Sequence, residues 1–76
     1  MITRLELSKH TTKHSAWCSI ERKVYDITRY LNEHPGGEDI LLRIAGSDAT
    51  GAFFQVHPWI NYEVLLDGCF IGLLID

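Results

Sequence analysis

The sequence predicts an α+β fold, in which a small mixed sheet from both ends of the chain packs against two helix pairs from its middle. Residues 24–27 are expected to alternate between inward and outward side chains, as in a half-buried strand, and residues 69–75 are apolar enough for a buried strand. Between these segments, Ile40, Leu41 and Ile44 follow helical spacing. A His-Pro dipeptide marks the junction between the two helices of each pair, because proline disfavours helical geometry in the residue before it.

A short helix is expected near the N-terminus. Thr3 suits the N-cap position of this helix, and Glu6 follows three residues later, where it completes a capping box. The helix should end near Lys9, and the polar residues 10–15 that follow should form a loop.

Two strands are expected after this loop, over residues 16–21 and 23–27. Arg22 and Lys23 are the expected turn between them. The strand over residues 69–75 completes the sheet, so that segments from both ends of the chain lie in it.

Four short helices are expected between the strands. They cover residues 29–33, 38–45, 49–55 and 60–66. Thr28 and Asp48 are the expected N-caps of the first and third helices, because short polar side chains satisfy the free N–H groups there. Pro35 should end the first helix at His34, and Gly46 should end the second.

The size of the chain predicts that something besides protein completes its core. With 76 residues it is expected to be one domain, covering residues 1–76 and excised from a longer multidomain protein. A chain of this length buries only about 60% of the surface that its unfolded form exposes. Because 46% of the residues are hydrophobic, the sequence is globular, but domains this small usually need a disulfide, a metal or a cofactor.

Cysteine content and charge exclude several classes of protein. Cys18 and Cys69 are the two cysteines, and we expect free thiols and an intracellular location, cytoplasmic or associated with the endoplasmic reticulum. The absence of a CxxCH motif means that any haem is bound without covalent attachment. A formal charge of −3 argues against nucleic-acid binding, and no apolar run approaches the roughly 20 residues of a membrane span.

His34 and His57 are the candidate functional residues. Each precedes a proline at a junction between two expected helices, and each is flanked by apolar side chains such as Leu31 and Phe53. Two imidazoles held across an apolar pocket suit a haem iron, because imidazole nitrogen binds iron well and porphyrin needs apolar walls. This pattern favours a haem site but leaves two alternatives open.

In the first alternative, both histidines are structural residues within the core. In the second, the protein is a structural zinc domain that uses His34, His57 and a cysteine. His10, His14 and Cys18 also lie four residues apart and resemble a metal cluster. Their segment is polar and loop-like, which disfavours a metal site there.

Four motifs give the chain a resemblance to the cytochrome b5 family that covers nearly its whole length. Residues 34–37 (HPGG) are similar to the family's first axial-ligand motif, and residues 24–28 (VYDIT) to the strand that leads into its haem pocket. Residues 45–50 (AGSDAT), with Phe53 after them, resemble the stretch that precedes the second ligand. Residues 70–72 (FIG) resemble the closing strand.

Within this family, the chain is most similar to the cytochrome b5 domain of the fused cytochrome b5/cytochrome b5 reductase oxidoreductases. Residues 54–57 (FQVH) and 59–63 (WINYE) carry this resemblance. It implies a flavin reductase domain, with FAD and NAD(P)H as its cofactors, after residue 76. The full protein would then be an NAD(P)H-dependent oxidoreductase, while this domain alone is an electron carrier.

The resemblance also implies a set of site residues. His34 and His57 would be the axial ligands of a haem b, iron protoporphyrin IX. The apolar haem contacts would be Ile20, Tyr30, Ile40, Leu41, Phe53, Val56, Leu65 and Cys69. Ile44, Leu66 and Ile71 are expected to be plain core residues. Val56 and Pro58 depart from the glycine and serine that flank the second ligand in the common family form.

The expected function is one-electron transfer through a bis-histidine haem. Electrons would come from a flavin reductase domain and pass to an acceptor such as a desaturase or another haem protein. With both axial positions filled, the iron has no open site for oxygen or substrate. The alternative from another class is a non-redox haem- or sterol-binding interaction module of the same fold. The domain is expected to be a monomer.

Overall fold

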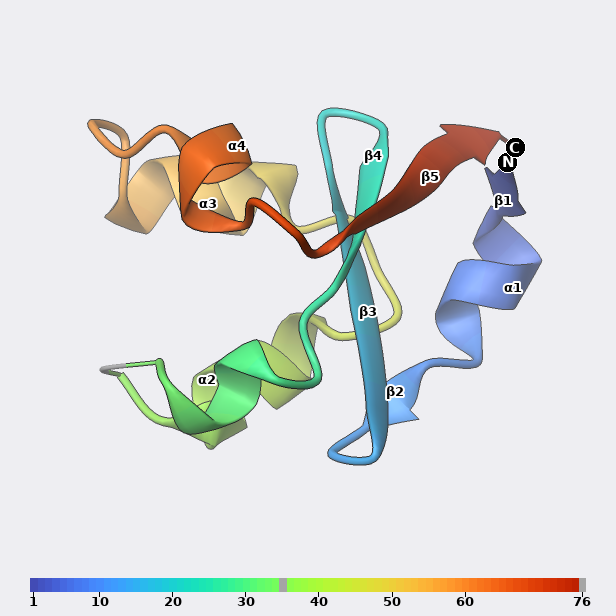
Figure 1. Ribbon diagram of the computed structural model, residues 1–76, viewed down its shortest axis with the longest axis horizontal. Coiled ribbons are helices and arrows are strands. Elements are labelled where there is room, and N and C mark those ends of the chain that lie inside the picture. Colours follow the sequence, from blue (N-terminus) through green and yellow to red (C-terminus); the bar gives the residue numbers. More distant parts are fainter. Residues whose placement is uncertain (35, 76) are drawn as a thin grey trace.

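The computed structural model describes residues 1–34 and 36–75, which form a five-stranded sheet with short helices on both sides (Figure 1). In chain order, the elements are β1 (Ile2–Thr3), α1 (Arg4–Ser8), β2 (Thr11–Thr12), β3 (Ser15–Ile20), β4 (Lys23–Asp26), the 3-10 helix η1 (Tyr30–Asn32), α2 (Glu38–Ile44), α3 (Thr50–Val56), α4 (Tyr62–Leu65) and β5 (Phe70–Ile75). The predicted α+β class is confirmed. Pro35, which was expected to end a helix at His34, lies outside the described residues, as does Asp76.

The sheet joins the two ends of the chain, as predicted. Its strand order is β1-β5-β4-β3-β2, with β1 parallel to β5 and the other pairs antiparallel. The strands β1 and β2 were not predicted, and β2 lies in the segment that was expected to be a loop. Each has only two residues, which is too short for alternation to be visible in a sequence.

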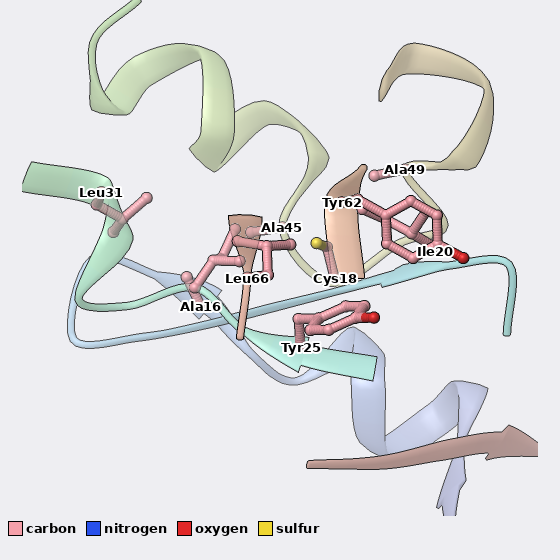
Figure 2. Packing of buried hydrophobic residues seen from close by; sticks show 10 residues of the cluster. Ala16, Cys18, Ile20, Tyr25, Leu31, Ala45, Ala49, Tyr62 and Leu66 are labelled. Carbon is pink, nitrogen blue, oxygen red and sulfur yellow. The ribbon is translucent and has the colours of Figure 1, made fainter. Parts of the chain in front are cut away.

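Side chains from the two faces of the sheet form two separate cores. Ala16, Cys18 and Ile20 alternate along β3 and pack beneath the two helix pairs η1–α2 and α3–α4 (Figures 1 and 2). On the other face, Leu7 of α1 packs with residues of β4 and β5. Among the described residues, no helix has the length and apolar character needed to cross a membrane.

The turn between β3 and β4 lies one residue earlier than predicted. Ile20 pairs with Lys23, and the residues between them, Glu21 and Arg22, have φ values of 51° and 69°. Positive φ at both central residues is the conformation that matches the twist of a two-residue hairpin. This conformation is energetically unfavourable for residues other than glycine, and two hydrogen bonds offset its conformational energy. Glu21 N donates to Thr50 Oγ1 (2.8 Å), and Leu74 N donates to Arg22 O (2.7 Å).

Of the predicted helix caps, Thr3 is confirmed and Thr28 is not. Thr3 is the N-cap of α1, as predicted, and its Oγ1 accepts a hydrogen bond from Glu6 N (3.1 Å). Thr28 is not a cap, because η1 begins after Arg29 and has no side-chain cap. Instead, Thr28 Oγ1 accepts from Ala16 N (2.9 Å) and joins the end of β4 to β3.

The predicted N-cap Asp48 lies one residue before the observed N-cap of α3, which is Ala49. Its Oδ1 nevertheless accepts hydrogen bonds from both Thr50 N (3.1 Å) and the Thr50 hydroxyl, and from Ser19 Oγ (3.2 Å). Burial alone would raise the pKa of Asp48, but these hydrogen bonds lower it below its ordinary value of 3.8. Asp48 therefore anchors the start of α3 to β3 as a carboxylate.

Replacing Asp48 by Ala should lower the free energy of unfolding by about 1–2 kcal/mol, because the start of α3 and the fully buried hydroxyl of Ser19 lose their acceptor. Denaturant unfolding at pH 7 measures this change. Asp48→Asn keeps an acceptor oxygen and should lose less. Because the carboxyl pKa is lowered by folding, the advantage of the wild type over Asp48→Asn is present at neutral pH and should fade as the pH drops below 3.8. Equal stability of Asp48→Ala and the wild type would contradict this prediction.

Candidate functional site

His34 is half-buried after η1, and a backbone hydrogen bond orients its ring. Its Nδ1 lies 2.9 Å from the carbonyl oxygen of Gly37. Because a carbonyl oxygen only accepts, Nδ1 carries the proton and Nε2 keeps a free lone pair. The ring also lies 5.7 Å from that of Tyr30, between centroids. This arrangement is the one in which histidine binds a metal through Nε2, with its other nitrogen held by a carbonyl.

The glycines that follow leave room for this ring. A Cβ atom at Gly36 would lie 2.9 Å from Cε1 of His34 and 3.3 Å from Cδ1 of Ile40. Gly37 has φ 93°, a conformation that L side chains rarely adopt. The two glycines are therefore required by the position of the imidazole and by the turn that carries the Gly37 carbonyl.

A methyl group at position 36 should displace the His34 ring. We expect Gly36→Ala to weaken haem binding by roughly 10- to 100-fold, the usual cost of disturbing a residue that orients a metal ligand. Haemin titration followed by absorbance measures the affinity. Gly51→Ala is the matched control, because a Cβ there meets no atom within 4 Å and lies within α3. Unchanged haem affinity in Gly36→Ala would show that the ring does not need this space.

His57 closes α3 and is held by aromatic rings. The backbone N–H of His57 donates to Phe53 O (2.7 Å), and His57 is the C-cap residue of the helix. Its ring lies 5.5 Å from the ring of Phe53 and 6.5 Å from that of Trp59, between centroids. The indole of Trp59 is 78% exposed, which is unusual for so large an apolar group. The imidazole of His57 therefore contacts one ring within α3 and one ring after it.

Three of the eight predicted lining residues are exposed. Ile40 is 52% exposed, Val56 is 60% exposed and Leu65 is 40% exposed. Within α2 and α3, every residue of which is described, not one is fully buried. These helices keep apolar side chains in water. A ligand that covered them would be stabilised there, because burying apolar surface contributes roughly 25 cal/mol per Å² of favourable free energy.

The other predicted lining residues lie deeper. Tyr30, Leu41, Phe53 and Cys69 are partly buried against the core cluster. Ile20 is only 2% exposed and packs within that cluster. Its role as a haem contact stays a prediction.

Of the three residues expected to be plain core, two are found there. Leu66 is buried and Ile44 packs against the same cluster. Ile71 is exposed and belongs to neither core cluster, so its assignment to the core was wrong.

The part of the chain that the structure describes holds no ligand set for zinc. Both ring nitrogens of His10 are hydrogen-bonded: Nε2 donates to Glu6 Oε2, and Nδ1 pairs with Ser15 Oγ, at 2.7 Å each. The ring also stacks on Trp17. Cys18 lies buried in the core, where burial raises the pKa of its thiol to about 12. Over residues 1–34 and 36–75, no group of three or more His, Cys, Asp or Glu side chains is placed to hold a metal ion.

One part of the site was missed by sequence reasoning. The motif at 34–37 identified the glycines, but nothing in it showed that the Gly37 carbonyl orients His34. A backbone acceptor has no side-chain signature. The only available signal was the pair of glycines itself, which permits a turn tight enough to bring the carbonyl back to the ring.

Comparisons with known proteins agree with the resemblance inferred from the motifs. Residues 3–75 match the model of the family described as "Cytochrome b5-like Heme/Steroid binding domain". "Cytochrome b5 reductase 4" of Bos taurus is 49% identical over 71 residues, which are 93% of this chain and 14% of that protein. The chain therefore spans about 14% of the length of this relative.

Two solved structures share the fold. "Cytochrome b5 of Ostreococcus tauri virus 2" superposes with a TM-score of 0.89 and 32% identity, over 100% of this chain and 98% of that one. Cytochrome b558 of Ectothiorhodospira vacuolata, described as a prokaryotic homologue of cytochrome b5, gives a TM-score of 0.81 and 28% identity, over 96% and 95% of the two chains.

Proposed function

The chain belongs to the cytochrome b5-like haem/steroid-binding family, and from this premise we propose that it carries single electrons on a haem b held between His34 and His57. The observation that carries the proposal is the hydrogen bond between His34 Nδ1 and Gly37 O. It fixes the tautomer that leaves the lone pair of Nε2 free to bind a metal. A histidine that only packed in the core would not need this orientation.

The apolar surface around the two histidines supports the same proposal. The exposed side chains of Ile40, Val56 and Leu65 come from three different helices. A flat apolar ligand between the helix pairs would remove them from water together. On this proposal they hold the cofactor by burial, without a covalent bond, and they keep water from the ligand nitrogens.

Each histidine has a defined task in this proposal. His34 would bind iron through Nε2 while the Gly37 carbonyl holds its proton at Nδ1. His57 would be the second residue to hold the group, with its imidazole in contact with the rings of Phe53 and Trp59. The bound haem supplies exchange of one electron between the ferric and ferrous states. If His34 and His57 both hold the group, the chain would leave no position at the iron for oxygen or substrates.

The partners belong to the proposal as well. The relative named cytochrome b5 reductase 4 is much longer than this chain, which supports electron delivery from a flavin reductase domain in the same polypeptide or a separate one. Such a domain would use FAD and NAD(P)H, and the acceptor would be a desaturase or another haem protein. The free thiols of Cys18 and Cys69 support an intracellular location.

A haemin titration of the purified chain tests this function. We expect saturation at one haem per chain and sharp α and β bands after reduction, which are the signature of six-coordinate low-spin iron. Mixing the haem-loaded chain with NADH and a flavin reductase should then reduce the iron. Haem that binds but is never reduced would favour the non-redox binding module, and the absence of saturation would reject the haem site.

A further inference from the structure

Tyr62, the first residue of α4, joins this helix to the sheet through its hydroxyl group. The side chain is 6% exposed and lies in the core cluster with Ile20 and Tyr25 (Figure 2). Its hydroxyl donates to Glu21 Oε1 (2.6 Å) and accepts from Lys23 Nζ (3.3 Å). Both partners belong to the β3–β4 hairpin, so one hydroxyl fixes the start of α4 against the turn.

The charges around this hydroxyl keep the network intact at neutral pH. Burial, and then the bond to Glu21, raise the pKa of Tyr62, so the phenol stays protonated. The bonds from Lys23 to Tyr62 and to Glu63 raise the pKa of the ammonium group. Lys23 Nζ also lies 3.2 Å from Glu63 Oε2, which attaches a second residue of α4 to β4.

The ring of Tyr62 joins α4 to α3. It meets the rings of Phe53 and Phe54 edge-on, at 5.9 Å and 6.0 Å between centroids. Phe53 in turn contacts His57 twice, through its ring and through the carbonyl that accepts the His57 N–H. A continuous set of contacts therefore runs from the hairpin through Tyr62 and Phe53 to His57.

His34 is held differently. Over the part of the chain that the structure describes, its ring contacts Tyr30 and Gly37, which lie within four residues of it in the sequence. The position of His34 is thus set locally, whereas that of His57 depends on how α3 and α4 sit on the sheet.

We propose that Tyr62 is a positioning residue for His57. The inference rests on the proposed function in one respect, that His57 is an iron ligand. Tyr62 fixes the pair α3–α4 on the β3–β4 hairpin, and Phe53 transmits this position to the imidazole. Loss of the hydroxyl loosens the His57 side of the pocket and leaves the His34 side in place.

Amide hydrogen exchange in the haem-free chain tests the proposal without the cofactor. In Tyr62→Phe, which keeps the ring, the amides of Phe53 and His57 should exchange about tenfold faster, since a hydrogen bond to a charged group is lost. The amide of Gly37, which donates to His34 O, should not change. Tyr25→Phe is the matched control, because Tyr25 contacts Tyr62 and Phe70 and lies in the same cluster. Equal acceleration on both sides, or none, would overturn the proposal.

The haem-loaded chain gives a second readout. The low-temperature EPR spectrum of the ferric form reports the orientation of the axial imidazoles, and its largest g value should shift in Tyr62→Phe but not in Tyr25→Phe. Haem release should become severalfold faster. Lys23→Met removes the other partner of the hydroxyl and should give the same pattern. An unshifted g value in both variants would refute positioning, whereas a wild-type chain without any low-spin signal would refute the proposed function and leave the exchange test standing.

Discussion

Replacing His57 by Ala should convert the haem-loaded chain from a six-coordinate low-spin form to a high-spin form with an open position. Disturbing a group that only orients a metal ligand weakens binding by roughly 10- to 100-fold, so loss of the ligand itself should weaken haem binding by about 100-fold or more. The reduced variant should also bind carbon monoxide, which the wild type should exclude. Absorption spectra and haemin titration measure all three effects.

His34→Ala should give the same result, with the bond to the Gly37 carbonyl lost as well. His14→Ala is the control, because His14 is exposed and lies in the turn between β2 and β3. If His57→Ala kept its low-spin spectrum and its haem affinity, His57 would not be the ligand, and Trp59 and Phe53 would be holding an imidazole with no role at the iron.

Haem should raise the melting temperature of the chain by about 15–30 °C. A ligand at 1,000 times its dissociation constant adds about 4 kcal/mol of stability, and each kcal/mol moves the melting temperature of a domain of this size by about 4–8 °C. The physical reason is the exposed lining: α2 and α3 bury none of their residues fully in the protein alone. Thermal unfolding with and without haem measures the shift, which should grow with haem concentration.

The double variant His34→Ala, His57→Ala is the control for that shift, because it keeps the apolar lining but lacks both proposed ligands. It should lose most of the stabilisation. A shift below about 5 °C for the wild type at saturating haem would show that the helix pairs are already stable without a ligand, contrary to the exposure of Ile40 and Val56.

Much of the fold could be predicted from the sequence, because its main strands carry a clear local pattern. The strands β3, β4 and β5 lie within one residue of the predicted bounds. The errors arose where a distant contact decides the structure. Thr28 has the side chain of a helix cap, yet its hydroxyl accepts a hydrogen bond from Ala16 on the neighbouring strand. The turn was predicted at Arg22 and Lys23 but lies at Glu21 and Arg22, which both have positive φ.

The candidate site shows the same division. The motif at 34–37 singled out His34, and the family resemblance that it carries is confirmed by the match over residues 3–75. The hydrogen bonds of the Tyr62 hydroxyl were not predicted, because its partners Glu21 and Lys23 lie 41 and 39 residues away in the sequence. The sequence also did not show which apolar residues stay exposed: Ile20 and Ile40 were both predicted to line the pocket, but Ile20 is 2% exposed and Ile40 is 52% exposed.

A crystal structure of the haem-loaded chain is the most direct test of the proposed site. It should show the Nε2 atoms of His34 and His57 bound to opposite faces of one iron, with His34 Nδ1 still donating to the Gly37 carbonyl. Iron bound by any other residue, or with one axial face empty, would contradict the bis-histidine site.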